Sequence, residues 1–336
     1  MTNRQKWLKN LVSLGKWAEG QLDVSLRIVT PIDDVWAAYK ESRKRPASGE
    51  STLKHYQVIW NQFARWLAEQ PVSGRISALD DLPEKFCEKY TAYLEQNRKV
   101  STVTKHLVVL KLIFRIVCPD IQNPWRDIRV MKVEAPEEKR KKRALEPKEV
   151  TRLIVSCRSL YEDSPILSAQ WVGLHLVGYW TGLRLYDAVH LSGEHIDVNM
   201  RVIRITPKKT GRKKPEPLEI PLSSELVSFF DEWAPESDFV FSALARMYDE
   251  QGSWRIVSYL SAIWDEAGVK GNAKGSATFH SLRVTFQSLN DNAGTSWVFT
   301  RAVTGHSDAK MSDTYSRSNI EVIRKAVTKA LPKVNN

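Results

Sequence analysis

Cysteine is scarce in this sequence, and its pattern excludes several classes of protein. The 336 residues include three cysteines, Cys87, Cys118 and Cys157, and no Cys-x-x-Cys pair. An odd number of widely separated cysteines argues against a disulfide framework and against a cysteine zinc site. We therefore expect a chain that works in a reducing compartment, the cytoplasm.

Long apolar runs are also missing. No stretch approaches the roughly 20 apolar residues that a membrane-spanning helix needs, so we expect no membrane partner. Residues 1–30 start with basic residues but contain neither a long apolar core nor a small-residue cleavage site. They indicate an N-terminal extension with an amphipathic helix rather than a signal peptide. Internal repeats and low-complexity tracts are absent as well.

Acidic residues are too few to balance the basic ones. Lys and Arg number 50 against 39 Asp and Glu, which gives a net charge of +11. Such an excess favours a polyanionic partner, either nucleic acid or an anionic membrane surface. The length exceeds that of most single domains, and the 42% hydrophobic content with 12 Trp is enough for ordered cores. Two domains are therefore expected.

The first expected domain spans residues 31–131 and is helical. Apolar side chains recur there at steps of three and four residues, which is typical of amphipathic helices. The pattern is clearest over residues 51–70 and 101–117, and each of these stretches begins with Ser-Thr, a reasonable cap. A third helix is expected over 80–96, with Pro83 near its start.

Apolar periodicity is lost over residues 132–146, which we interpret as a basic linker. Five consecutive basic residues lie in it. A solvated segment that binds nothing is one interpretation, but the sign of the charge and the place between two globular segments favour contact with phosphates. The residues predicted to make these DNA contacts are Lys139, Arg140, Lys141, Lys142 and Arg143.

Periodicity resumes in the second expected domain, residues 147–336. The stretch 168–182 is almost entirely apolar and indicates a buried helix, and further helical stretches follow to the end. Residues 201–206 and 217–222 alternate apolar and polar side chains, which predicts two short strands. The pattern as a whole predicts a mainly α fold with a small antiparallel β-sheet, an α+β catalytic domain.

Several polar residues of this second domain could carry chemistry. Each has an ordinary structural interpretation when taken alone: an arginine after a buried helix often forms an ion pair, hairpin lysines are usually solvated, and a lone histidine often caps a helix. His280 and Arg283 are at positions i and i+3, on one face of an expected helix. The candidate residues are Arg184, Asp187, Lys208, Lys209, Arg212, Lys213, His280, Arg283, His306 and Tyr315.

Together these side chains suit a phosphodiester. Two arginines can grip its non-bridging oxygens with planar donors, and a tyrosine hydroxyl can attack its phosphorus. A histidine can take the tyrosine's proton, a lysine can protonate the departing sugar oxygen, and a further histidine can stabilise the developing charge. No carboxylate cluster is present to hold a catalytic metal. The inventory therefore predicts phosphoryl transfer with neither metal nor other cofactor.

The motifs around these residues resemble those of the tyrosine recombinase (phage integrase) family of site-specific DNA recombinases. The segments "TGLRLYDAVHL", "KKTGRKK", "FHSLR" and "TGHSDAKMSDTY" match the family's boxes in order and spacing over about residues 147–330. Thr-Gly-His stands where Leu-Gly-His is usual, and Tyr186 where small or polar residues are more familiar. These departures remove no catalytic side chain, but no cellular role is transferred.

The resemblance implies a catalytic role for six residues and a mechanism. Tyr315 would attack one DNA strand to form a 3′-phosphotyrosyl link, and the 5′-hydroxyl of a partner duplex would then attack that link. The two domains would close around the duplex as a clamp, and Lys208, Arg212 and Lys213 would contact DNA. The residues that carry over as catalytic are Arg184, Lys209, His280, Arg283, His306 and Tyr315, with Asp187 as the acidic neighbour.

Two alternatives and one question of assembly stay open at this point. A type IB topoisomerase shares the fold and the nucleophile, and a DNA-binding regulator could use the same scaffold without cleavage. The resemblance also implies a homo-oligomer, a tetramer on two paired duplexes of a double-stranded recombination site. The C-terminal segment 318–336 has an apolar stripe that either packs on its own domain or docks on a neighbouring protomer, and the second is favoured.

Overall fold

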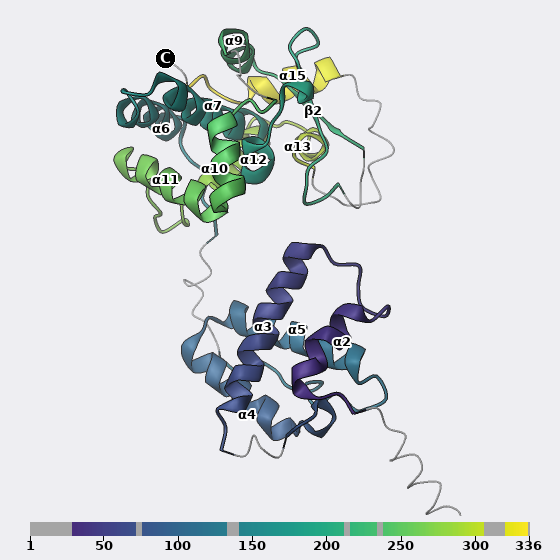
Figure 1. The fold of residues 1–336 in the computed structure, drawn as a ribbon. Helices are drawn as coiled ribbons and strands as arrows, with labels where there is room; N and C mark the ends of the chain where they lie inside the picture. The colour runs from purple at the N-terminus through teal and green to yellow at the C-terminus, as the bar shows by residue number, and fades with distance from the viewer. Residues whose placement is uncertain are drawn as a thin grey trace, which may run out of the picture. The chain divides into compact units, whose positions relative to one another are not determined.

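The structure is a computed structural model, which describes residues 29–71, 76–132, 141–211, 216–233, 238–305 and 320–334. The amphipathic helix expected within residues 1–30 lies outside them. The chain divides into two compact units, Met1–Lys139 and Arg140–Asn336, each of which is described by itself (Figure 1). None of the helices in the described ranges is both long and apolar enough to cross a membrane.

The first unit is a helical domain with an aromatic core. The ring of Phe63 packs edge-on against Tyr90 and Trp125, at centroid distances of 5.1 and 5.2 Å. Such edge-to-face contacts add to the stabilisation from burial. The helices expected from periodicity are present here. Their bounds are η1 (Ile32–Asp34), α2 (Val35–Glu41), α3 (Glu50–Ala68), η3 (Leu79–Asp81), α4 (Glu84–Asn97) and α5 (Val100–Val117).

The second unit is built around helix α7 (Pro165–Thr181), whose residues from Gln170 to Thr181 are all buried. Helices α6, α9, α10 and α12 pack against it, so a nearly continuous apolar sequence finds partners on all sides (Figure 1). The remaining bounds are α6 (Pro147–Leu160), α8 (Leu185–Val189), η5 (Gly193–His195), α9 (Ser224–Glu232), α10 (Ser242–Gln251), α11 (Ser253–Glu266), α12 (Phe279–Asn292), α13 (Trp297–Thr304) and α15 (Ile320–Lys329).

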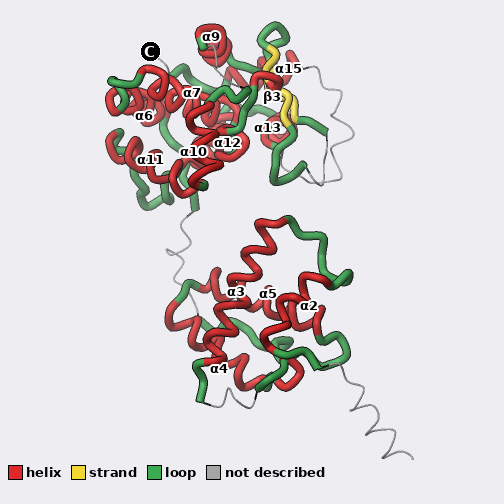
Figure 2. The backbone as a smooth tube through the Cα atoms, in the orientation of Figure 1, coloured by secondary structure: helices red, strands yellow, loops and turns green. Residues whose placement is uncertain are grey.

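A small antiparallel sheet of order β1-β2-β3 stands beside these helices (Figure 2). Its strands are β1 (Ile196–Asp197), β2 (Val202–Ile205) and β3 (Leu218–Pro221). In β2 and β3, Ile203 lies opposite Ile220, and both are buried. Helices α13 and α15 pack against β3. The predicted fold class, mainly α with a small antiparallel sheet, is confirmed.

The segment from Lys141 to Arg143 does not behave as a free linker. The Arg143 N–H donates to the Ser276 carbonyl at 3.1 Å, and the Ser276 N–H donates to the Lys141 carbonyl at 2.9 Å. The Arg143 guanidinium, 7% exposed, forms a bidentate pair with Glu149 at 2.7 Å and also donates to the Lys270 carbonyl. These bonds inside the protein occupy the guanidinium, so the expectation that Arg143 contacts DNA is corrected.

The C-terminal helix α15 packs on its own unit. Ile323, Val327 and Leu331 of the expected apolar stripe are buried in the core of the second unit. The tail is held further by the Tyr179 hydroxyl, which donates to the Pro332 carbonyl at 3.0 Å. The interpretation favoured from sequence, docking of this stripe on a neighbouring protomer, is therefore not what the structure shows.

Candidate active site

Two helices of the second unit end in the same way, and each end precedes a predicted catalytic residue. Helix α7 ends in Thr181-Gly182 and α13 ends in Thr304-Gly305. Both glycines are left-handed, with φ of +63° and +66°, a conformation that costs glycine little. Each threonine hydroxyl donates to the carbonyl four residues earlier, at 2.5 and 2.7 Å. The repeated Thr-Gly pair was a signal in the sequence for this shared geometry.

Arg283 ties the two helix ends together. Its side chain is 3% exposed, and its two terminal nitrogens donate to the carbonyls of Gly182 at 2.7 Å and Thr304 at 2.6 Å. A cation at two helix C-termini is also favoured by the helix dipoles. Burial, followed by the nearby positive charge of Arg184, lowers the pKa of Arg283 to about 10. One buried guanidinium thus joins Gly182 and Thr304, which are 122 residues apart in the sequence.

Arg184 lies directly after the first of these turns, at the N-cap of α8, and is half-buried. Among the described residues, none accepts a hydrogen bond from its guanidinium. The two predicted phosphate ligands therefore differ in the structure. Arg283 is bonded to the protein at two points, whereas Arg184 can rearrange toward an anion without breaking a bond to a described residue.

Asp187 reaches a partner that the sequence did not suggest. It was expected only as the acidic neighbour of Arg184, and its Oδ1 accepts a hydrogen bond from the Lys208 backbone N–H at 3.0 Å. The side chain is 5% exposed, and this burial raises its pKa in spite of that bond and of the charges of Arg184 and Arg283. Asp187 therefore connects α8 to the β2–β3 loop that carries the lysines.

The structure brings His280 into a group of positive charges. Partial desolvation lowers its pKa, and the charges of Arg283, Arg184, Lys142 and Lys209 lower it further. The two predicted phosphate ligands and the predicted hairpin lysine are therefore near enough to His280 for their charges to act on it. Four cations whose charges all act on one histidine favour a bound polyanion such as a DNA phosphate.

Lys142 is closer to this group than its place in the expected linker suggested. Its Nζ donates to the Ser276 hydroxyl at 3.0 Å, just before α12 begins. The close approach of the two segments depends on Gly275, where a Cβ would lie 2.1 Å from the Lys141 carbonyl oxygen. The sequence contained no signal for this contact, because the two segments are far apart in the chain.

Six of the predicted residues lie outside the described ranges. Of the catalytic set, His306 directly follows Gly305, and Tyr315 lies further along the same segment. Their predicted roles stay predictions. Of the expected DNA contacts, Lys141, Lys142, Arg143 and Lys208 are described. The contacts outside the described ranges are Lys139, Arg140, Arg212 and Lys213.

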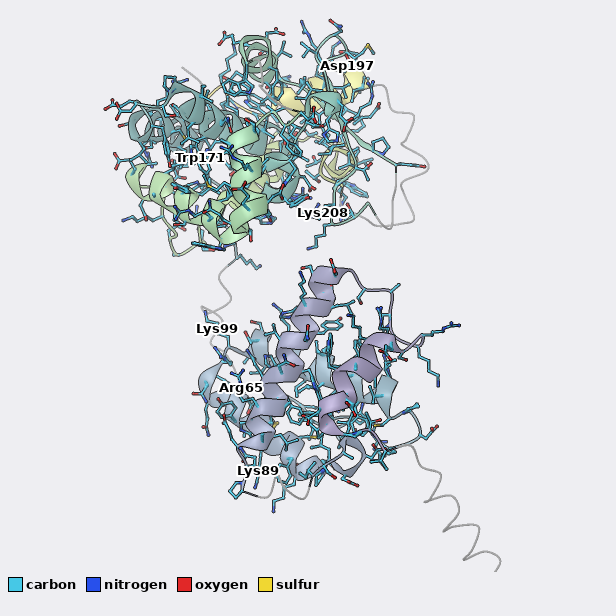
Figure 3. The ribbon with its side chains drawn as sticks, in the orientation of Figure 1. Arg65, Lys89, Lys99, Trp171, Asp197 and Lys208 are labelled. Atoms are coloured by element: carbon cyan, nitrogen blue, oxygen red, sulfur yellow. The ribbon has the colours of Figure 1, made fainter. Side chains whose placement is uncertain are left out.

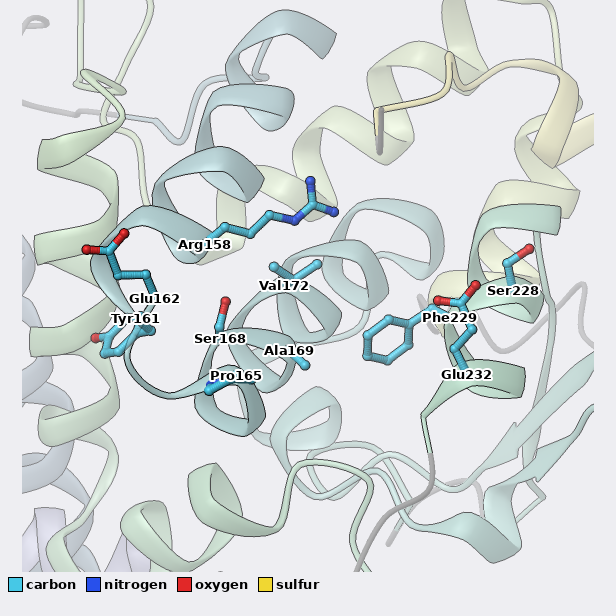
Figure 4. A pocket seen from close by; sticks show the side chains of 10 residues that line it. All are labelled: Arg158, Tyr161, Glu162, Pro165, Ser168, Ala169, Val172, Ser228, Phe229 and Glu232. Carbon is cyan, nitrogen blue, oxygen red and sulfur yellow. The ribbon is translucent and has the colours of Figure 1, made fainter.

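A separate cavity of about 430 Å³ lies between α6, α7 and α9 (Figure 4). It follows the N-terminal half of α7, while Arg184 follows the C-terminal end of that helix. Its lining mixes Arg158 with the acidic Glu162 and Glu232. Charges of both signs do not favour a phosphate, so the cationic group around His280 is the better candidate for an active site.

The sequence of this chain is similar to those of a known protein family and of individual proteins. The profile of the phage integrase family matches residues 143–321. The tyrosine recombinase XerA of Thermococcus kodakarensis is 25% identical over 156 residues, and that of Pyrococcus furiosus is 25% identical over 159 residues. Each alignment covers 46% of this chain and 53% or 52% of the relative. The chain thus spans about half the length of the curated relatives it matches.

Solved structures share the fold at low sequence identity. The Tn1549 transposon integrase in complex with transposon right end DNA has a TM-score of 0.58 and 17% identity, covering 89% of this chain and 99% of that one. A lambda integrase tetramer bound to a Holliday junction has a TM-score of 0.57 and 16% identity, covering 88% and 80%. These similarities concern the fold.

Proposed function

The chain belongs to the phage integrase family, and on that premise we propose that it is a tyrosine-type site-specific DNA recombinase. It cleaves and rejoins double-stranded DNA through a 3′-phosphotyrosyl intermediate, with neither metal nor nucleotide cofactor. The observation that carries the proposal is the Arg283 guanidinium, which joins the turn before Arg184 to the turn before His306. It supports the proposal because Arg283 is itself a predicted catalytic residue and each of the two turns directly precedes another in the sequence.

In the proposed cleavage step, Arg184 and Arg283 bind the non-bridging oxygens of the scissile phosphate. The Tyr315 oxygen forms a bond to phosphorus, and the bond from phosphorus to the 5′-oxygen breaks. The tyrosine proton passes to His280, and the 5′-oxygen takes a proton from Lys209. His306 donates a hydrogen bond to the charge that builds on the phosphate.

The electrostatics of His280 support the role of proton acceptor. A base must be neutral before it can accept, and the lowered pKa favours the neutral imidazole near pH 7. The same surrounding cations stabilise the charge that develops on the phosphate. The cluster thus supports proton transfer and charge stabilisation in the same place.

In the rejoining step, the 5′-hydroxyl of a partner strand attacks the phosphotyrosyl link and releases Tyr315. Because the link keeps the energy of the original phosphodiester, no external energy source is consumed. Exchange between two duplexes requires several active sites, so we propose a homotetramer on paired recombination sites of a mobile genetic element. The tetramer named for lambda integrase and the transposon integrase among the fold neighbours support this assembly and role by analogy.

DNA affinity is proposed to come mainly from phosphate contacts by both units. Arg65, Lys89 and Lys99 are exposed on the first unit, and Lys208 lies at the surface of the second (Figure 3). Each phosphate contact releases counterions, so affinity should fall steeply as salt rises. The proposed contacts of the second unit and the connecting segment are Lys139, Arg140, Lys141, Lys142, Lys208, Arg212 and Lys213, without Arg143.

The decisive experiment traps the covalent intermediate. The protein is incubated with EDTA and a nicked duplex from which the short 5′-terminated fragment diffuses away after cleavage. Wild type should form a protein–DNA adduct that survives denaturation, and Tyr315→Phe should form none. Tyr161→Phe, which removes a hydroxyl at the C-terminal end of α6 beside the separate cavity, should form the adduct normally. An absence of adduct from wild type on DNA carrying its own flanking sites would refute the proposal.

A relaxation assay separates recombination from topoisomerase activity. Supercoiled plasmids with no site, one site or two sites are incubated with the wild-type protein. A recombinase should yield new DNA junctions only from the two-site plasmid. Relaxation of the site-free plasmid as fast as that of the plasmids with one or two sites would favour the topoisomerase instead.

A further inference from the structure

Tyr186 is the residue of the first arginine motif that the proposed mechanism leaves unused. It stands two residues after Arg184, on the short helix α8, and is half-buried. The Lys208 ammonium lies over its ring, with Nζ 3.7 Å from the ring centroid. This distance is well within the range of a cation–π contact. The contact joins α8 to the β2–β3 loop.

The second face of the Tyr186 ring is also covered. The His190 ring stacks on it with 4.0 Å between centroids and 19° between planes. An ammonium and an imidazole at these distances would collide on one face, so the tyrosine ring lies between them. The ring of Tyr248 meets Tyr186 edge-on at 5.5 Å. The phenol ring therefore has little room to turn.

His190 is fixed in its turn by two hydrogen-bonding contacts. Its Nδ1 lies 2.9 Å from the Tyr186 carbonyl oxygen, and its Nε2 lies 3.0 Å from Asp249 Oδ1 on α10. The stack of Tyr186 and His190 is thus anchored to a second helix. Because two helices hold these stacked rings, the Lys208 ammonium contacts a fixed aromatic surface rather than a mobile side chain.

Lys208 is consequently held at both its ends. Its backbone N–H donates to the buried Asp187, and its ammonium sits on the Tyr186 ring. The loop beyond closes on itself, because the N–H groups of Thr210 and Gly211 both donate to the Pro207 carbonyl, at 3.2 and 2.7 Å. Lys209, the proposed general acid, directly follows the clamped Lys208 and lies inside this closed turn.

We propose that Tyr186 is a positioning residue, which clamps Lys208 and thereby holds Lys209 where it can protonate the departing 5′-oxygen. The inference rests on the proposed function for its reaction and on the contacts above for its geometry. General-acid catalysis requires the donor within hydrogen-bond reach of the leaving atom. A loop released from this aromatic surface would spend part of its time with Lys209 misplaced, which slows cleavage without altering the phosphate ligands.

The first test compares two leaving groups. Tyr186→Leu removes the ring, Tyr186→Phe keeps it, and Lys208→Gln removes the cation. On ordinary DNA, single-turnover cleavage should slow by about tenfold in Tyr186→Leu and in Lys208→Gln, as expected for loss of one cation–π contact. Tyr186→Phe should stay within about threefold of wild type. Lys148→Gln, an exposed lysine on α6 of the same unit, is the matched control for loss of charge.

Replacing the bridging 5′-oxygen by sulfur then isolates the role of Lys209. A thiolate leaves without a proton because thiols are far more acidic than alcohols. The defects of Tyr186→Leu and Lys209→Ala should therefore shrink to less than threefold on the sulfur substrate, while that of Arg184→Ala should persist. An equal defect of Tyr186→Leu on both substrates would overturn the inference. So would a Tyr186→Phe variant as slow as Tyr186→Leu.

A second measurement examines the clamp without any reaction. Protons on the ε-carbon of Lys208 lie over an aromatic face, so their NMR signals should be shifted upfield in wild type and in Tyr186→Phe but not in Tyr186→Leu. Absence of the shift in wild type would overturn the clamp even if cleavage is normal. If the shift is present but wild type forms no covalent adduct, the clamp stands, and both the proposed function and the role of Tyr186 in it are overturned.

Discussion

Arg283→Lys tests whether one guanidinium holds the active site together. The wild-type side chain donates to two buried carbonyl groups at 2.7 and 2.6 Å. A lysine keeps the charge but has a single nitrogen on a flexible stem, and it cannot span both carbonyls in the planar arrangement of the guanidinium. At least one charged hydrogen bond is lost, and a hydrogen bond of this kind contributes about 1.5–3 kcal/mol.

The free energy of unfolding of the second unit should therefore fall by about 2 kcal/mol, a factor of about 30 in its unfolding equilibrium. Cleavage should fall further, because both the phosphate contact and the turn that leads to Arg184 are disturbed. Denaturant unfolding, monitored by hydrogen exchange in peptides of α7, measures the stability of the second unit. Adduct formation on the nicked duplex measures the reaction.

Arg301→Lys is the matched control, because Arg301 is an exposed arginine on α13 whose guanidinium lies 4.7 Å from the ring centroid of Trp297. This change should alter stability by less than about 0.5 kcal/mol. If Arg283→Lys is as stable as Arg301→Lys, Arg283 does not join the two helix ends. If it loses stability but cleaves normally, the joint is structural and the proposed catalytic role of Arg283 fails.

Three further predictions concern the same unit. Gly275→Ala should lower the free energy of unfolding by about 2 kcal/mol or more in denaturant unfolding, because a Cβ there meets the Lys141 carbonyl. Gly268 is also left-handed but has no neighbouring atom within contact distance, so Gly268→Ala should cost about 1 kcal/mol. Equal costs for the two changes would contradict the close approach at Gly275. The acid limb of kcat/KM for cleavage should lie below pH 6.5, because desolvation and neighbouring cations lower the pKa of His280, and a limb above 6.5 would contradict this. Burial lowers the pKa of His175 to about 4, so below pH 6.5 the unfolded chain binds a proton at this histidine that the folded unit does not bind. The free energy of unfolding should therefore be highest above pH 6.5 and should fall by about 2 kcal/mol as the pH is lowered from 6.5 to 5. A flat pH profile of stability over this range would refute the reasoning.

Local pattern was enough to predict much of this protein. The main helices of both units and the strands β2 and β3 follow from the spacing of apolar residues along each segment, whereas the short strand β1 was not predicted. Four of the six predicted catalytic residues are described, and Arg184, Lys209, His280 and Arg283 form one electrostatic group. Their identification depended on the order of short motifs, which sequence shows directly.

Side-chain partners far apart in the chain were decided by tertiary structure alone. Arg143 is one of five consecutive basic residues in the sequence, yet its partners Glu149 and Lys270 make it an anchor rather than a DNA contact. The apolar stripe of α15 could pack either on its own unit or on a neighbouring protomer, and only the tertiary structure shows it buried in the core of its own unit. Periodicity states that a face is apolar but does not name the surface that covers it.

The same division holds at the active site. The sequence by itself determined which chemical groups are available, because charge, acidity and nucleophilicity belong to individual side chains. Tertiary structure decided that Arg283 bonds to two helix ends, and that Lys208 rests on Tyr186. Hydrogen bonds and cation–π contacts act over a few ångströms, so they depend on which distant segments folding brings together.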